Sequence, residues 1–311
     1  MRISVSISIF NSLAALLLGA IFVPIALGQT EQPGVRSEML VSTDWLTAHL
    51  HDADVVVISV SSGADFYTSG HIPGARHIAL GEIAVTRNGV PNELPSADQL
   101  KQVFEAAGIT NSSRVVLYGE RYGLFASRAY FTLDYLGLAD HVALLDGGID
   151  KWKAEHRELS NETPKVAPGH LKISLNKSIL IETAAMRDLT QRKSGKVAIV
   201  DARPADEFSG GKLSEEVPKA GHILGAIGLY WMKNLVSKEN PVLRPEAELR
   251  SLYADLAPPG GEMVTYCRSG MQSAFDYFVA KYLGYEVSMY DASFYEWSRQ
   301  DLPVETSDAR K

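Results

Sequence analysis

The sequence predicts an α/β fold of two tandem domains, each with a mostly parallel sheet that helices cover on both faces. The first observation is a repeat: the motif Gly-His-Ile-x-Gly-Ala at residues 70–75 recurs at 221–226. The second is that later matches keep their order, as in Asp-Tyr-Leu-Gly at 134–137 and Lys-Tyr-Leu-Gly at 281–284. The third is an alternation of short apolar runs with helical patterns. The repeat therefore comprises a whole domain and not a solenoid unit.

The first half shows these elements in order. Apolar runs that predict buried strands lie at 55–60, 115–118 and 142–145. A helical stripe is formed by Leu100, Val103, Phe104 and Ala107, with Gly108 as a plausible C-cap. A further helix is expected over 124–136. The pattern is typical of parallel strands joined by helices.

The second half repeats the pattern, with strands expected at 197–201 and 263–266. After residue 266, Phe275, Phe278, Val279 and Tyr282 follow the i, i+3, i+4, i+7 spacing of an amphipathic helix. Between the halves lies a polar stretch with prolines and a glycine, which predicts a linker. We expect domains at 38–156 and 173–311, joined by a linker at 157–172.

The N-terminus resembles a secretory signal. Arg2 is followed by an apolar stretch, and small residues at 26 and 28 suit cleavage after Gly28. Residues 1–28 are therefore expected to be a signal peptide. The alternative is an uncleaved anchor, because the stretch is near the spanning length. Both place the remainder outside the cytoplasm, and cleavage would leave a periplasmic or secreted protein with no stable membrane association.

Composition excludes some classes of function. The formal net charge is -7 and no basic run occurs, which gives no support for nucleic-acid binding. His49 and His51 lack other ligand-type neighbours, and we expect no metal site and no cofactor. The chain has a single cysteine, so an internal disulfide is impossible.

That cysteine is Cys267, which lies between the expected strand at 263–266 and the following helix. Unpaired N–H groups and the helix dipole favour negative charge at such a position, and Arg268 adds a positive charge beside it. We therefore expect a reactive thiolate. The alternative is a buried, inert cysteine, against which the polar Arg-Ser-Gly context argues.

The repeat allows the two halves to be compared at this position. Tyr118-Gly119 is the first-half counterpart of Tyr266-Cys267, so the first half has glycine where the second has the thiol. Only the second half is expected to perform thiol chemistry.

Two α/β repeats, the second with Cys-Arg-x-Gly after a strand, resemble the tandem-domain rhodaneses, or sulfurtransferases. The resemblance covers roughly residues 38–305, including the Asp-Ala-Arg segment at 201–203 and the tryptophan segments at 146–152 and 291–297. It implies two rhodanese-like domains, the first inactive and the second catalytic. It also implies that a cysteine persulfide carries sulfur from thiosulfate or mercaptopyruvate to cyanide or a thiol.

The resemblance assigns the site residues one by one. Cys267 would be the nucleophile, and the loop that contacts the donor would be Arg268, Ser269, Gly270, Met271, Gln272 and Ser273. The loop combines features of two kinds of family member. Arg268 resembles the loop residue of thiosulfate-using members, and Ser269 resembles that of mercaptopyruvate-using members. Glu207 stands where members often carry an arginine that holds the donor, and we expect this acid to repel anions.

From the residues themselves, the loop N–H groups would stabilise the sulfur anion, and Arg268 would hold the anionic remainder of the donor. Arg203 is expected to form a structural ion pair with Asp201 or Asp206. His71 and His222 recur in both halves, and we expect them to bond loop backbone.

Two alternatives stay open. One is a cysteine-dependent phosphatase or arsenate reductase. That class needs an arginine six positions after the cysteine to bind the oxyanion with two hydrogen bonds, and Ser273 at this position argues against it. A sulfur carrier or interaction module would pass the persulfide between proteins, and it accommodates Glu207 and the mixed loop.

Overall fold

The computed structural model describes residues 1, 2, 4, 34–191 and 196–307. The expected signal peptide at 1–28 lies outside the described residues, apart from residues 1, 2 and 4. The chain divides into the units Met1–Glu31 and Gln32–Lys311, and the elements below belong to the second unit. In the described part of the chain, no helix combines the length and apolar character needed to cross a bilayer.

The first half contains a parallel sheet in the strand order β1-β7-β6-β2-β3. β2 (Val55–Ser61) is buried at every position, as its run of β-branched residues predicts for a central strand. The first-half elements are η1 (Ser37–Met39), β1 (Leu40–Val41), α1 (Thr43–His49), β2 (Val55–Ser61), α2 (Ala64–Thr68), β3 (Arg76–Ala79), α3 (Leu80–Ile83), β4 (Val85–Arg87), β5 (Val90–Glu93), α4 (Ala97–Ala106), β6 (Arg114–Gly119), α5 (Leu124–Tyr135), η2 (Ala139–His141), β7 (Val142–Leu145) and α6 (Gly148–Ala154).

The second half contains a parallel sheet in the order β10-β8-β11-β12, and β13 pairs antiparallel with β9. The second-half elements are η3 (Lys177–Ile179), α7 (Thr183–Gln191), β8 (Val197–Asp201), α8 (Ala205–Ser209), β9 (His222–Ile223), β10 (Ile227–Gly228), η4 (Trp231–Asn234), α9 (Glu246–Ala254), β11 (Glu262–Tyr266), α10 (Gln272–Tyr282), β12 (Glu286–Met289), α11 (Ser293–Trp297) and β13 (Val304–Glu305). The predicted fold class and the strands and helices expected from the repeat are confirmed.

Each of the two parallel sheets has an apolar cluster on both faces. In β2, Val56 and Ile58 belong to one cluster and Val55 and Val57 to another, because successive side chains of a strand point to opposite faces of the sheet. One of these clusters is shared, since it includes residues of both halves such as Phe131 and Phe278. The halves therefore have a common core as well as separate outer ones.

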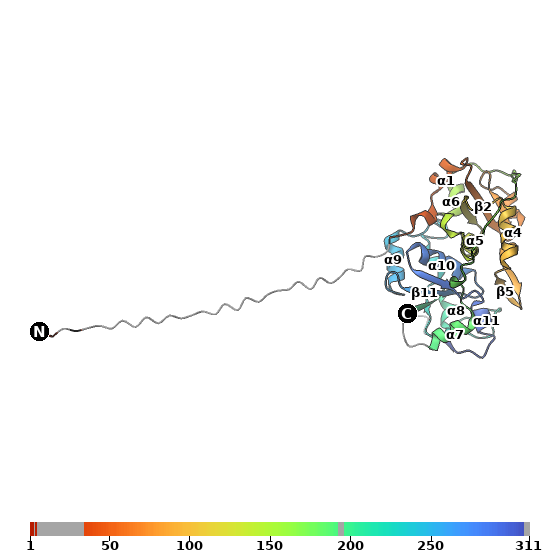
Figure 1. The fold of residues 1–311 in the computed structure, drawn as a ribbon. Coiled ribbons are helices and arrows are strands. Elements are labelled where there is room, and N and C mark those ends of the chain that lie inside the picture. Colours follow the sequence, from red (N-terminus) through yellow and green to blue (C-terminus); the bar gives the residue numbers. More distant parts are fainter. Residues whose placement is uncertain (3, 5–33, 192–195, 308–311) are drawn as a thin grey trace. The chain divides into compact units, whose positions relative to one another are not determined.

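Helices α5 and α10 form the centre of that shared core (Figure 1). Tyr130 meets Phe278 edge to face at 5.0 Å, and Phe131 meets Tyr277 at 5.1 Å. Asp134 of α5 accepts a hydrogen bond from the Tyr277 hydroxyl at 2.6 Å and forms an ion pair with Lys281. Such edge-to-face aromatic pairs are each worth about 0.5–1.5 kcal/mol beyond their buried area.

The segment between the halves packs along the first half. Ser160 forms a β-bridge with His71, and the Leu171 N–H donates to Glu105 Oε1 at 2.7 Å. The backbone of the polar connecting segment is thus tied to the first half by hydrogen bonds.

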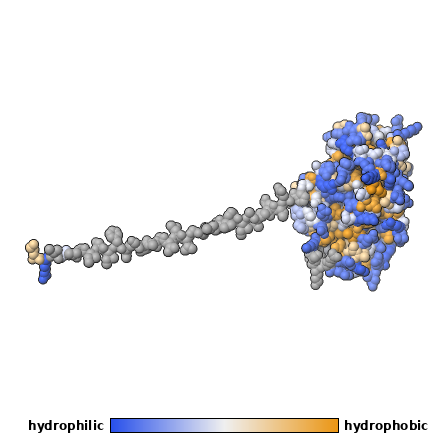
Figure 2. All heavy atoms as spheres, in the orientation of Figure 1, coloured by the Kyte–Doolittle hydropathy of each residue, from blue (hydrophilic) through white to orange (hydrophobic). Residues whose placement is uncertain are grey.

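Polar and charged residues cover most of the face shown in Figure 2, and apolar residues gather in its middle.

Candidate active site

Cys267 follows β11 and precedes α10, in the strand-to-helix loop that the sequence predicts. Its side chain is buried, with 1% of the residue exposed, and it belongs to the shared apolar cluster. Gly270 completes the loop with a φ of +79°, in the left-handed region. A Cβ at Gly270 would lie 2.5 Å from Asp291 Oδ1, so no larger residue fits without a shift.

Ser293, at the start of α11, anchors the loop by hydrogen bonds. Its hydroxyl oxygen accepts from the N–H of Cys267 at 3.2 Å and from the N–H of Gly270 at 3.1 Å, and it donates to the Tyr290 carbonyl at 2.9 Å. The N–H of Gly270 is therefore already satisfied and does not face the sulfur as expected. Ser293 also has a φ of 57°, which is rare for a residue with a side chain.

Sequence reasoning missed Ser293, although the repeat holds a signal. The tryptophan segments align Ser293 with Gly148, whose φ of 54° is nearly the same. A serine where the other half has glycine in a left-handed conformation indicates that the hydroxyl offsets a backbone cost.

Other N–H groups of the loop remain open. Among the described residues, no acceptor is found for the backbone N–H groups of residues 268, 269, 271, 272 and 273. Met271, the N-cap of α10, has no side chain that caps the helix. The loop and first helical turn thus present several unsatisfied donors beside a thiol, which is the arrangement that binds an anionic atom.

The Ser273 hydroxyl lies within hydrogen-bonding distance of the thiol. Its hydroxyl is 3.5 Å from Cys267 Sγ and 3.3 Å from Met289 Sδ, so its one proton can be directed to either sulfur. Ser269 accepts a hydrogen bond from Asn92 of the first half at 2.9 Å. Met271 packs against the shared cluster, and the buried Oε1 of Gln272 has no hydrogen-bond partner.

Arg268 is held by two carboxylates. Glu207 contacts the guanidinium through both oxygens, one of them 3.3 Å from Nε, and Glu216 lies 3.4 Å from Nη1. Burial lowers the pKa of Arg268, but the hydrogen bond and charge of Glu207 outweigh it and raise the pKa overall. The side chain of Arg268 is 30% exposed.

Glu207 therefore has surroundings different from those expected. Its side chain is 3% exposed and paired with Arg268, so it is not a free carboxylate in the cleft. The expected effect of Glu207 on an anion would therefore be competition. Glu207 and an anionic donor would compete for the same guanidinium, that of Arg268.

The contacts expected for Arg203, His71 and His222 are confirmed. Arg203 forms a buried ion pair with Asp201, with Nη2 2.6 Å from Oδ2. His71 bonds the Tyr67 carbonyl at 3.0 Å, and His222 bonds the Phe208 carbonyl at 2.8 Å. The two histidines of the repeated motif thus bond backbone carbonyls, and Arg203 bonds a neighbouring carboxylate.

The structure also supports the alignment of Gly119 with Cys267. The N–H of Ile72 donates to the Tyr118 hydroxyl at 3.2 Å, and the N–H of Ile223 donates to the Tyr266 hydroxyl at 3.1 Å. The two tyrosines are thus equivalent, and so are the residues after them. A Cβ at Gly119 would lie 2.5 Å from the Val60 carbonyl oxygen, so the first half has no room there for a thiol.

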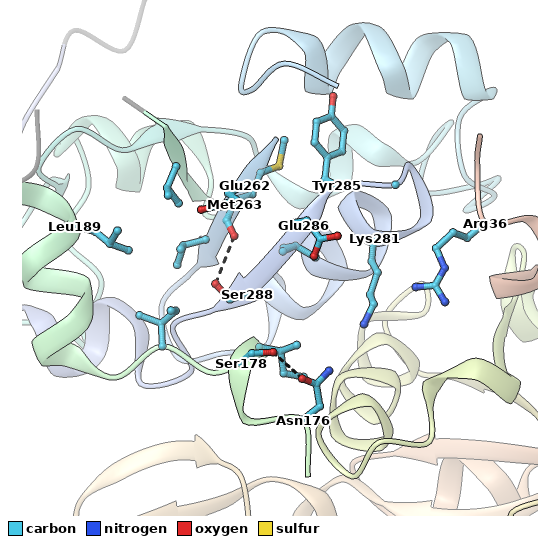
Figure 3. Close-up of a pocket in the computed structure, with 16 residues that line it drawn as sticks. Arg36, Asn176, Ser178, Leu189, Glu262, Met263, Lys281, Tyr285, Glu286 and Ser288 are labelled. Carbon is cyan, nitrogen blue, oxygen red and sulfur yellow. Dashed lines mark hydrogen bonds between the residues drawn. The ribbon is translucent and has the colours of Figure 1, made fainter. Parts of the chain in front are cut away.

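A groove of about 500 Å³ lies at the other end of β11, among β12, the end of α10 and residues 176–181 (Figure 3). Figure 3 shows the side chains of Lys281 and Arg36 pointing into this region from one side. The first half has a groove of about 660 Å³ at the matching place, beside the start of β6. Neither groove is lined by Cys267, and their recurrence makes them a property of the repeated fold.

The rhodanese-like domain family model matches residues 42–155 and again 186–300. The chain therefore belongs to the rhodanese-like family, as a tandem of two such domains.

Three curated relatives cover most of the chain. It is 34% identical over 273 residues to the sulfur carrier protein TtuD of Thermus thermophilus, across 84% of this chain and 93% of the relative. It is 32% identical over 289 residues to the thiosulfate sulfurtransferase of Corynebacterium glutamicum, across 88% and 92%. It is 33% identical over 289 residues to the probable 3-mercaptopyruvate sulfurtransferase of Pseudomonas aeruginosa, across 88% and 100%.

Proposed function

We propose that this protein is a sulfurtransferase that moves a sulfane sulfur from thiosulfate or a related donor to a thiophilic acceptor through a persulfide on Cys267. The observation that carries the proposal is the set of open N–H groups at residues 268, 269 and 271–273, beside the only cysteine of the chain. The names of the thiosulfate and mercaptopyruvate sulfurtransferase relatives support the same reaction.

The reaction balances without an added oxidant or reductant. The Cys267 thiolate attacks the outer sulfur of thiosulfate, the S–S bond of the donor breaks, and sulfite leaves with the bonding electron pair. Cyanide then attacks the terminal sulfur of the persulfide, which releases thiocyanate and regenerates the thiolate. From mercaptopyruvate the C–S bond would break instead, and the enolate of pyruvate would leave with the bonding electron pair and then take up a proton at carbon.

The roles of the loop follow from its contacts. The open N–H groups stabilise the thiolate and the terminal sulfur of the persulfide as fixed donors. The Ser273 hydroxyl, 3.5 Å from Sγ, adds a donor that can rotate with the sulfur. Arg268, which remains partly exposed, would hold the anionic remainder of the donor in competition with Glu207.

The test is a donor screen on the purified mature protein with thiosulfate, mercaptopyruvate and polysulfide, using cyanide and dithiothreitol as acceptors. Mass spectrometry should find one added sulfur on Cys267 after the donor alone. Cys267→Ser should fold normally and lose the transfer. Residual activity within about tenfold of wild type would overturn the assignment, because loss of a nucleophile should cost far more.

A second candidate is a sulfur carrier that passes the persulfide to a protein. The name of the Thermus thermophilus relative favours it, and so do the two carboxylates that occupy Arg268. Slow turnover with every small acceptor, together with full persulfide loading, would favour the carrier over the enzyme.

We also propose that the protein acts in the periplasm or outside the cell, after cleavage of residues 1–28. The apolar stretch and the small residues at 26 and 28 support this. N-terminal sequencing of the exported form should begin at Gln29. Intact Met1 in a membrane fraction would favour the anchor.

A further inference from the structure

Two side chains of the silent first half reach the Cys267 loop. Asn92, in the β4–β5 hairpin, donates from Nδ2 to the Ser269 hydroxyl at 2.9 Å. Arg128, in α5, donates from Nη1 to the Gly270 carbonyl at 3.3 Å. Both contacts join residues more than a hundred positions apart, so neither could be read from the sequence pattern.

Arg128 is completely buried and makes further contacts. Its guanidinium forms a two-pronged ion pair with Asp291, at 2.5 Å to Oδ1 and 3.1 Å to Oδ2. Its Nη2 also donates to the Asn92 carbonyl at 2.5 Å. Asp291 in turn accepts from the Leu94 N–H at 3.2 Å. One guanidinium thus binds the hairpin, the loop and the segment after β12 at once.

Asp291 is coupled to the loop by close packing. The Cα of Gly270 is so near that a Cβ there would lie 2.5 Å from Asp291 Oδ1. Two residues after Asp291, Ser293 takes the N–H groups of Cys267 and Gly270. The position of Asp291 therefore constrains Gly270 directly and Cys267 through Ser293.

We propose that Arg128 is a positioning residue for sulfur transfer, which fixes the direction of the open loop N–H groups from the silent half. The proposal rests on the proposed function, since it assigns Arg128 a part in that reaction. It gives the first half a specific role: Arg128, Asn92 and Asp291 form what we call the loop clamp.

The chemistry of the clamp favours arginine. A planar guanidinium donates along several fixed directions, whereas a lysine ammonium is a compact charge that cannot keep the same geometry. A buried ion pair is weak evidence for stability, because desolvation offsets much of the attraction. The contacts of Arg128 with the loop account better for this residue than stabilisation does.

The experiment compares Arg128→Lys with Asp134→Asn. Both alter an ion pair between α5 and the second half, but the bonds of Asp134 run to Tyr277, Lys281 and Asn176, and in the described part of the chain none reaches the Cys267 loop. For each variant the assay measures thermal stability, kcat and KM for the donor found in the screen, and the rate of iodoacetamide alkylation of Cys267 against pH.

Arg128→Lys should lower kcat by about 10- to 100-fold, as expected for a misplaced catalytic loop, with a smaller change in KM. The midpoint of its alkylation profile should move to higher pH, because the N–H groups no longer favour the thiolate. Asp134→Asn should lose stability but keep its kcat and alkylation profile. An unchanged kcat and profile in folded Arg128→Lys would overturn the proposal, and so would equal losses in Asp134→Asn.

If Arg128→Lys does not fold, Asn92→Gly provides the test. Asn92 has a φ of 60°, which glycine adopts freely, so this variant removes the Ser269 contact without backbone strain. It should shift the alkylation profile in the same direction, and an unchanged profile would overturn the clamp. If wild type transfers no sulfur from any donor, the proposed function fails, while the alkylation profiles still decide whether the clamp positions the loop.

Discussion

Replacing Glu207 tests how the protein binds an anionic sulfur donor. Glu207 is buried, with its side chain 3% exposed, and pairs with the guanidinium of Arg268. Glu207→Gln keeps the shape and removes the charge, whereas Glu207→Arg would place a second guanidinium in a buried site beside the first. The glutamine variant is therefore the cleaner perturbation.

The magnitude follows from Coulomb's law. A donor anion on the exposed side of Arg268, about 6 Å from the Glu207 carboxylate, is repelled by about 3 kcal/mol at an effective dielectric near 20. Solvent and salt reduce this to about 1 kcal/mol, because 30% of the Arg268 side chain is exposed. We expect Glu207→Gln to lower KM for thiosulfate by about fivefold.

The assay is steady-state thiocyanate formation at several ionic strengths. Glu216→Gln is the matched control, since Glu216 contacts the same guanidinium but its side chain is 56% exposed. The control should change KM by less than about twofold, as is typical of an exposed ion pair. The gain from Glu207→Gln should shrink as salt rises. A KM that is unchanged or higher at low salt would refute the competition and would indicate that Glu207 orients Arg268 productively.

Three further predictions concern stability and the two halves. Residues 173–311 expressed alone should be insoluble or inactive, because α10 would expose Tyr277 and Phe278; a soluble, fully active fragment would contradict this. Gly119→Cys should be destabilised, as measured by thermal unfolding, and should carry no persulfide at residue 119, since its Cβ would meet the Val60 carbonyl. Burial raises the pKa of Asp276, so the folded state keeps a proton that the unfolded state releases above about pH 4, and this group costs stability as pH rises. Asp276→Asn should therefore unfold at a higher temperature than wild type by a margin that grows from pH 5 to 8, and parallel curves would contradict that sign.

The fold could be predicted because its signals are local. The run of β-branched residues at 55–60 forms a fully buried strand, and the apolar spacing after Cys267 forms α10. The comparison of Gly119 with Cys267 needed only the repeat, and the equivalent hydrogen bonds of Tyr118 and Tyr266 support it.

The contacts of the site could be predicted only in part, because they join distant residues. Arg268 pairs with a carboxylate 61 positions away, and Arg128 with one 163 positions away. No periodicity encodes such pairs. The resemblance placed Glu207 near the donor but said nothing of its partner, and the role expected for the Gly270 N–H was wrong because Ser293 accepts it.

The first half differs from the second in more than a missing thiol. Its loop closes so tightly that the Val60 carbonyl occupies the space of a side chain at Gly119, and Glu120 bonds back to Ser62. Because the anchors of the active loop come from both sides, Ser293 within the second half and Arg128 from the first, the loop geometry depends on how the halves pack. Substitutions in the α5–α10 core that displace Arg128 should therefore alter the alkylation rate of Cys267, whereas those that leave Arg128 in place, such as Asp134→Asn, should only lower stability.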